Sequence, residues 1–157
     1  MIMKKQFFTL GVILVILFAG AELGATAKAQ RKLKQVKVYL YHHPGEHIDL
    51  SPVTRSVNAV APARGAIEAL LAGPTATEKE QGFGELASAS EFRIGSLRIS
   101  RGTARVNFVS KKSWAGWPGD IAPIRFKTAV ELTLKQFPTV KRVIVSLDGD
   151  AKFWDES

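Results

Sequence analysis

The sequence predicts an α+β fold in which a small mixed β-sheet has two amphipathic helices packed on one face. Apolar and polar residues alternate in residues 36–41, as in a strand with one buried face. Apolar residues recur every three or four positions in residues 62–72, as in an amphipathic helix. These two periodicities, followed along the chain, give the order β-β-α-β-β-α-β, and such elements bury one another when both helices cover the same side of the sheet.

The first two strands are predicted at residues 36–41 and 48–57. Pro52 interrupts the second strand, and a proline cannot donate a hydrogen bond to a neighbouring strand. The second strand is therefore expected at an edge of the sheet. The inward-facing positions of the first strand are Val36, Val38 and Leu40.

The first helix is predicted from Pro62 to Ala72. Pro62 suits a first helical turn, and the Gly73-Pro74 pair suits the end of a helix. Residues 73–91 show little periodicity, so we expect an irregular loop that is long enough to be functional or mobile. The apolar face of the helix comprises Ala63, Ala66, Ile67, Leu70 and Leu71, and Arg64 and Glu68 form an i, i+4 pair on the opposite face.

A hairpin is predicted at residues 92–109, with its turn at Arg101-Gly102. The apolar positions change from even to odd numbers across Gly95-Ser96, which indicates a β-bulge. A second helix follows at residues 122–136, with Asp120 as a candidate N-terminal cap. Its inward stripe comprises Phe126, Ala129, Val130, Thr133 and Phe137.

The last strand is predicted at residues 140–147 and is the most apolar of the chain. Its Val143-Ile144-Val145 run is typical of a strand in the centre of a sheet. Asp148 and Gly149 then form a turn.

Residues 1–29 are predicted to be a secretory signal peptide, and residues 30–157 a single domain with its core in 36–149. Lys4 and Lys5 precede an apolar run from Phe7 to Ala21, which is followed by small residues. The run is short for a membrane span, although an uncleaved N-terminal anchor is the alternative. We therefore expect an exported protein that is periplasmic, extracytoplasmic or secreted. The chain has no Cys, so its stability must come from an ordinary core.

The chain is basic, with a formal net charge of +8, and the excess is concentrated in one segment. Residues 93–112 contain no Asp or Glu. Such a distribution favours an anionic envelope polymer, anionic lipid headgroups or an acidic protein as the partner, and export makes nucleic acid an improbable one. The basic residues of this segment are Arg93, Arg98, Arg101, Arg105, Lys111 and Lys112.

No catalytic residue, cofactor or metal site is predicted. The chain has no G-x-S-x-G motif and no phosphate-binding glycine loop, and its acids are spread over loops and a helix face. His42, His43 and His47 lie together beside Asp49, a ligand set that suits zinc. Their spacing fits no established zinc pattern, so we expect a solvated loop and no tightly bound metal.

The open face of the predicted sheet is the main candidate for partner binding. Side chains on alternate positions would give it a basic and aromatic character, with a solvated face of no other function as the alternative. A second candidate is the loop with Trp114 and Trp117, whose indoles could instead close the open end of the core. The open-face residues are Lys37, Tyr39, Tyr41, Arg98, Arg105 and Arg142, together with Asn107.

Several segments resemble the GerMN domain of sporulation and spore germination proteins. They are the helix and its exit, PARGAIEALLAGPTATEKEQGF from Pro62 to Phe83, and the hairpin motif G-T-A-x-V-x-F from Gly102 to Phe108. VKVYLY at 36–41, LSPVTRSV at 50–57 and TLKQFPTVKRVIVSLDG at 133–149 complete the resemblance.

The resemblance implies a layered α+β fold and a non-catalytic, extracytoplasmic domain of cell-envelope assembly, sporulation or germination. The partner would be an envelope protein or an anionic envelope polymer, with a homo-oligomer possible and membrane contact only through an uncleaved N-terminal segment. The alternative is an envelope glycan-acting enzyme or accessory factor.

The chain departs from the family pattern at three points. Many relatives have Asp at the position of Asn107, and an I-P-x-G-T pattern in the segment that is here 86–94. Many are also lipoproteins, which a chain without Cys cannot be. These departures bear on the identity of the partner more than on the fold.

Overall fold

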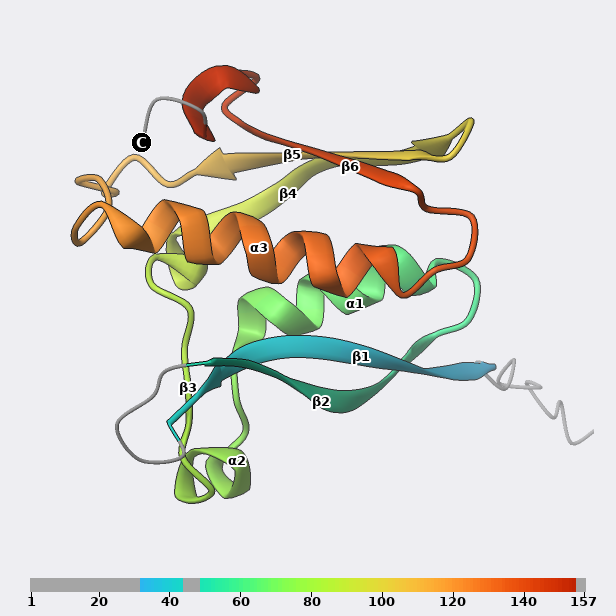
Figure 1. The fold of residues 1–157 in the computed structure, drawn as a ribbon, viewed down its shortest axis with the longest axis horizontal. Coiled ribbons are helices and arrows are strands. Elements are labelled where there is room, and N and C mark those ends of the chain that lie inside the picture. Colours follow the sequence, from blue (N-terminus) through green and yellow to red (C-terminus); the bar gives the residue numbers. More distant parts are fainter. Residues whose placement is uncertain (1–31, 44–48, 155–157) are drawn as a thin grey trace, which may run out of the picture. The chain divides into compact units, whose positions relative to one another are not determined.

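The computed structural model describes residues 32–43 and 49–154, and it confirms the α+β class and the predicted element order. Figure 1 shows the arrangement. Additional short elements lie between α1 and β4 and after β6. The elements are β1 (Leu33–His42), β2 (Asp49–Asn58), α1 (Pro62–Ala72), α2 (Ala76–Glu80), β3 (Phe83–Gly84), η1 (Ala89–Glu91), β4 (Phe92–Ser100), β5 (Thr103–Ser110), α3 (Ile121–Lys135), β6 (Arg142–Leu147) and η2 (Lys152–Trp154).

The strands form two three-stranded sheets, so the prediction of a single sheet was wrong. One sheet has the order β2-β1-β3 and is antiparallel, and the other has the order β4-β5-β6 with a parallel β5-β6 pair. Helices α1 and α3 lie between the two sheets and pack against both (Figure 1). Apolar alternation shows which face of a strand is buried, but it does not show which strands pair.

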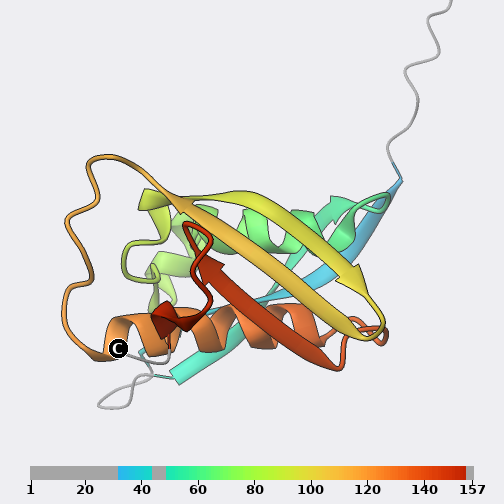
Figure 2. The ribbon, with the colours of Figure 1, turned by 90° about the horizontal axis from the view of Figure 1, so that it is seen from above.

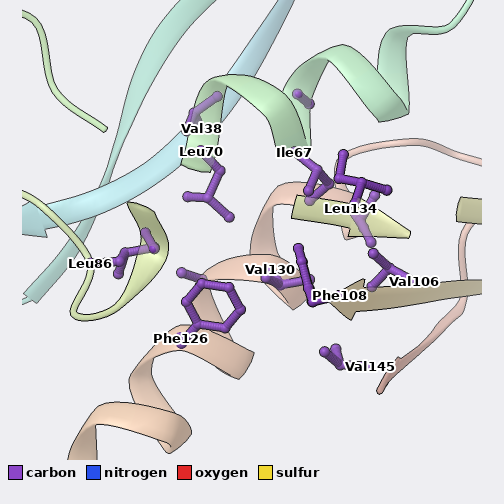
Figure 3. Close-up of a cluster of buried hydrophobic side chains, with 14 of the residues drawn as sticks. Val38, Ile67, Leu70, Leu86, Val106, Phe108, Phe126, Val130, Leu134 and Val145 are labelled. Atoms are coloured by element: carbon purple, nitrogen blue, oxygen red, sulfur yellow. The ribbon is translucent and has the colours of Figure 1, made fainter. Parts of the chain in front are cut away.

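The core is a single cluster shared by both sheets and both helices. Figure 3 shows its centre, where side chains of the helices meet those of β1 on one side and of β5 and β6 on the other. Phe108 and Phe126 are its largest fully buried side chains. The labelled members are Val38, Ile67, Leu70, Leu86, Val106, Phe108, Phe126, Val130, Leu134 and Val145.

The β4-β5 hairpin has the predicted bulge, because its register shifts between Ile94 and Ser96. Gly95 lies in the bulge, where an added Cβ would come within 2.8 Å of a Val109 methyl group. A larger residue would therefore require the Val109 side chain or the neighbouring backbone to shift. The hairpin turns at Arg101 and Gly102, which both have positive φ angles, as a tight hairpin turn requires.

The edges of the two sheets confirm one prediction and correct another. β2 pairs only with β1, as expected from Pro52. β6 was expected in the centre but is an edge strand, and β5 is central. The apolar residues of β6 are explained by its inner face, where Val145 and Leu147 are buried beneath α3 and η2.

The segment between α1 and β4 was expected to be irregular but contains α2, β3 and η1. The helix α2 begins with a capping box, in which the Thr75 hydroxyl accepts from the Glu78 N–H and the Glu78 carboxylate accepts from the Thr75 N–H. The sequence contains this signal as T-x-x-E, but it is not a periodic pattern, and α2 was therefore not predicted. The two-residue strand β3 pairs with Tyr41 and His42 at the end of β1.

The predicted signal segment, residues 1–29, lies outside the described residues, so its cleavage and the resulting domain boundary stay predictions. Among residues 32–43 and 49–154, no helix is long and apolar enough to cross a membrane.

Candidate interaction surfaces

The six residues predicted on one open face lie on two different sheets. Arg98, Arg105 and Arg142 are exposed on the outer face of the β4-β5-β6 sheet. Lys37 and Tyr39 belong to the β2-β1-β3 sheet, on the other side of the helical layer. The single basic and aromatic face is therefore wrong, because it assumed that all these strands share one sheet.

The three arginines form a compact basic group, which we call the arginine face. Arg98 and Arg105 are direct register partners on β4 and β5. Arg105 also lies beside Ile144 of β6, two positions from Arg142. Figure 2 views this sheet from above, with neither α1 nor α3 over it and with the short η2 at the end of β6. Within the described residues, none of the three side chains forms an ion pair or a side-chain hydrogen bond.

This arrangement has an electrostatic cost, because like charges directly opposite on neighbouring strands repel each other. The placement of Arg98 opposite Arg105 therefore does not stabilise the fold. An acidic partner would relieve the repulsion.

Asn107 shares the outer face with the arginines and is one of the departures from the family pattern. Its Oδ1 accepts hydrogen bonds from the Ser146 hydroxyl and the Gly149 N–H, each at 2.9 Å. The side chain thus ties β5 to the end of β6. An aspartate could accept the same two hydrogen bonds, so asparagine keeps this contact and leaves the face without a negative charge.

Lys37 and Tyr39 lie where a helix covers the free edge of β1. The Gln136 side chain donates to the Lys37 carbonyl and accepts from the Lys37 N–H, both at 2.7 Å. The Thr133 hydroxyl accepts from the Tyr39 N–H at 3.3 Å. These side chains of the α3 region replace a neighbouring strand, which protects the edge against pairing with another chain.

Tyr41 was predicted on an open face, but it is buried. The Arg125 guanidinium of α3 lies over the Tyr41 ring at 5.5 Å from its centroid, and β3 pairs with this end of β1. Burial raises the pKa of the Tyr41 hydroxyl, and the Arg125 charge opposes this shift. Tyr41 is therefore part of the packing around β1 and is not accessible to a partner.

Trp114 and Trp117 are half-buried and pack into an aromatic cluster at one end of the core. Both rings contact Phe92, at centroid distances of 5.2 and 5.3 Å, and Trp117 also contacts Phe126 and Trp154. The two indoles thus close one end of the core, which was the alternative to partner binding that the sequence left open. The indole N–H groups of Trp114, Trp117 and Trp154 are buried without a hydrogen-bond partner in the described part of the chain.

The histidine loop is described only in part, because His47 lies outside the described residues. The His42 ring stacks on Phe83 at 4.4 Å, and its Nε2 lies 3.2 Å from the Gln81 carbonyl oxygen. His42 thus joins the end of β1 to the turn before β3. Within the described ranges, no group of three or more His, Cys, Asp or Glu residues is placed to hold a metal ion.

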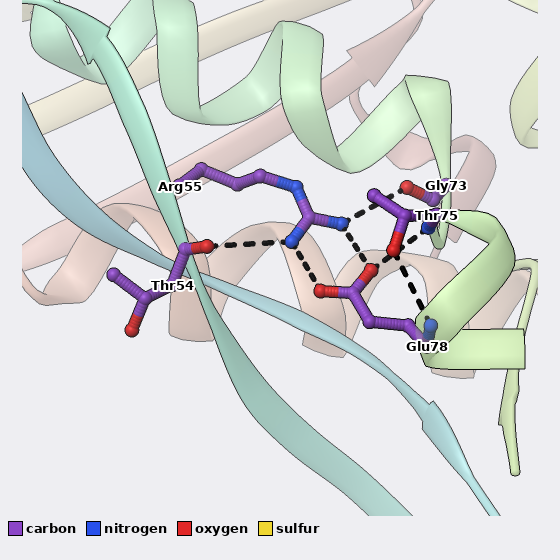
Figure 4. A network of polar contacts seen from close by, with 5 residues as sticks. All are labelled: Thr54, Arg55, Gly73, Thr75 and Glu78. Atoms are coloured by element: carbon purple, nitrogen blue, oxygen red, sulfur yellow. Dashed lines mark hydrogen bonds and ion pairs between the residues drawn. The ribbon is translucent and has the colours of Figure 1, made fainter. Parts of the chain in front are cut away.

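A half-buried ion pair that was not predicted joins Arg55 of β2 to Glu78 of α2 (Figure 4). The two guanidinium nitrogens Nη1 and Nη2 donate to the two Glu78 oxygens, the second at 2.6 Å, and Nη2 also donates to the Gly73 carbonyl. The Arg55 hydrogen bonds hold the pKa of Glu78 at about 2, below its usual value of 4.5. This network fixes the exit of α1 against the first sheet.

Comparison with known proteins identifies the family. The family model described as Germane, sporulation and spore germination, matches residues 37–152. Two similar solved structures come from the sporulation protein GerM of Bacillus subtilis. The first of its GerMN domains has 19% identity and a TM-score of 0.55, with 74% of this chain and 84% of that chain covered.

The tandem GerMN domains of the same protein have 19% identity and a TM-score of 0.58. The match covers 80% of this chain but 43% of that chain, so this chain corresponds to less than half of the tandem structure. No curated protein sequence matches significantly. The family match spans most of the described domain and agrees with the fold, and this chain therefore belongs to the GerMN family of sporulation and spore germination domains.

Proposed function

We propose that this chain is a non-catalytic interaction domain of the cell envelope that acts outside the cytoplasm and binds an acidic partner through the arginine face. Family membership supports a role in sporulation or germination, or in a related envelope process. The predicted signal segment supports export. An acidic envelope protein and an anionic envelope polymer both match the charge of this surface.

The observation that supports the proposal most strongly is that Arg98 and Arg105 lie opposite each other without an ion-pair partner among the described residues, on a sheet face that neither α1 nor α3 covers. Arginine is well suited to this use, because its planar guanidinium binds carboxylates and phosphates with two parallel hydrogen bonds. Arg142 extends the group across the third strand. A partner with acids spaced across strands would contact all three side chains at once.

Replacing Arg98 and Arg105 together by Ser should weaken binding to an isolated envelope fraction about tenfold, mainly by loss of electrostatic attraction. Binding of the parent should fall steeply with salt, because exposed charges are screened over about 8 Å at physiological ionic strength. The free energy of unfolding should change by less than about 0.5 kcal/mol or rise slightly, since a repulsion is removed. Sedimentation with the envelope fraction and urea unfolding measure the two quantities.

The matched control is the double replacement of Lys111 and Lys112 by Ser, which removes the same charge from an exposed segment outside the arginine face. It should retain binding close to that of the parent. Equal losses in both double variants would show that net charge alone matters, and the arginine face would not be the binding site. An unaffected Arg98/Arg105 variant would also reject the proposal.

A further inference from the structure

One end of the domain combines exposed apolar side chains with unpaired cations. Four segments meet there, namely the start of β1, the β2-α1 connection, the β4-β5 turn and the α3-β6 connection, at the right-hand end of Figure 1. We call this end the basal pole. It comprises residues 32–35, 58–64, 99–103 and 137–141.

The basal pole contains a groove of about 450 Å³ with a largely apolar lining. Its lining includes Ile99 of β4, the Phe137-Pro138 pair after α3, and Val60 and Pro62 of the β2-α1 connection. Val60 is 88% exposed. Leu33 is 63% exposed and pairs with Asn58, two residues before Val60. They are two of the four exposed large apolar side chains of the described residues.

The charges of the basal pole have one sign. Its four segments contain no Asp or Glu, and their basic residues are Lys32, Lys34, Arg64, Arg101 and Lys141. Only Arg64 has an ion-pair partner among the described residues, which is Glu68 at 2.8 Å on the next turn of α1. The Lys34 ammonium lies over the Phe137 ring at 5.8 Å, so its stem borders the groove while the charge stays at the surface.

The chain also enters the domain at this pole. Residues 1–31 precede Lys32 and include the apolar run from Phe7 to Ala21. The ten or so residues between that run and Lys32 can span at most about 35 Å, even when fully extended. Whenever the apolar run is in a membrane, chain length therefore keeps the start of β1, and with it the basal pole, within about 35 Å of the end of that run.

We propose that the basal pole is a membrane-docking surface that contacts anionic phospholipids. Apolar side chains would enter the headgroup boundary while the surrounding lysines bind lipid phosphates, the combination by which peripheral surfaces hold to bilayers. This inference goes beyond the proposed function, because it uses a surface separate from the arginine face. Docking would leave the arginine face free for its partner.

The test uses the full chain in vesicles, where the absence of native Cys permits labelling at a single introduced cysteine. A nitrobenzoxadiazole fluorophore is attached in one variant at Val60→Cys and in another at Ile124→Cys, an exposed position on α3 outside the pole. In vesicles of phosphatidylcholine with phosphatidylglycerol, the Val60 probe should brighten and shift to the blue relative to pure phosphatidylcholine. The emission of the Ile124 probe should remain that of a probe in water in both kinds of vesicle.

Replacing Lys34 and Lys141 by Gln should reduce the ratio of docked to undocked chains about 30-fold, at about 1 kcal/mol for each cation near an anionic surface. The Val60 probe would then return to its emission in neutral vesicles. The Arg98→Ser/Arg105→Ser variant should keep the parent response, so failure of this proposal and failure of the arginine face are distinguishable.

Three results would overturn the membrane-docking proposal. They are a Val60 probe that remains in water in anionic vesicles, an Ile124 probe that shifts as much as the Val60 probe, and a response that survives the loss of both lysines.

Discussion

Replacing Phe126 by Ala is expected to lower the free energy of unfolding by about 3–5 kcal/mol, which is a large part of the stability of a domain of this size. Phe126 is 1% exposed on α3 and contacts aromatic rings from four other parts of the chain, among them Trp117 at a centroid distance of 5.5 Å. Its ring centroid lies 5.1 Å from that of Phe108, 5.3 Å from Phe92 and 5.8 Å from Trp154. The substitution would leave a cavity where the β4-β5-β6 sheet, the Trp117 loop and the C-terminal segment pack against one side chain.

Urea unfolding followed by fluorescence measures this effect. Phe126→Leu should lose less stability, because it fills much of the same volume, and Thr128→Ala, at an exposed position of the same helix, should change it by less than about 0.5 kcal/mol. A Phe126→Ala variant as stable as Thr128→Ala would show that the aromatic cluster is not part of the core.

Replacing Glu78 by Gln is expected to cost about 2–3 kcal/mol near neutral pH, because Arg55 would lose a charged partner in a half-buried position. The pKa of Glu78 is about 2 in the folded chain and near 4.5 when unperturbed. The stabilisation by its ionised form is thus complete above pH 4.5 and is lost as the pH falls towards 2. The stability difference between the parent and the Gln variant should therefore narrow over that pH range.

Glu68→Gln is the matched control, because Glu68 forms an exposed i, i+4 pair with Arg64. Such pairs contribute about 0.3–0.5 kcal/mol, so the effect of Glu68→Gln on the free energy of unfolding should be small. A stability difference for Glu78→Gln that stays constant from neutral pH to pH 2 would contradict the role assigned to the Arg55 ion pair.

Local features of the fold were predictable because their causes are local. Pro62 and Gly73 bound α1 as expected, and the predicted Arg64-Glu68 pair is present at 2.8 Å. The change of parity at Gly95 correctly located the bulge of the hairpin. Each of these signals depends on residues within a few positions of one another.

The division into two sheets was not predictable from the same patterns. A strand that buries one face against helices has the same alternation whether those helices are covered by one sheet or lie between two. The position of β6 illustrates this, because its apolar run reflects burial beneath α3 rather than a central place in the sheet. The sequence contains no local signal for this long-range choice.

The candidate site was predicted in part for the same reason. Arg98 and Arg105 do share one face, because the hairpin that joins them was recognised. Lys37 and Tyr39 were assigned to that face only on the assumption of one sheet. The Arg55-Glu78 pair was missed because it joins residues that are distant in sequence, although the T-x-x-E capping signal at Thr75 would have located α2.

Site-directed photo-crosslinking in the envelope would show whether the outer face of the β4-β5-β6 sheet is the binding surface. A cysteine-linked photo-crosslinker is placed at Ser96, exposed on β4 beside the arginine face, and in a second variant at Thr54, exposed on β2 of the other sheet. We expect a discrete cross-linked product from Ser96 that disappears in the Arg98→Ser/Arg105→Ser background, and no product from Thr54. A product from Thr54 with none from Ser96 would contradict it and place the partner on the opposite sheet.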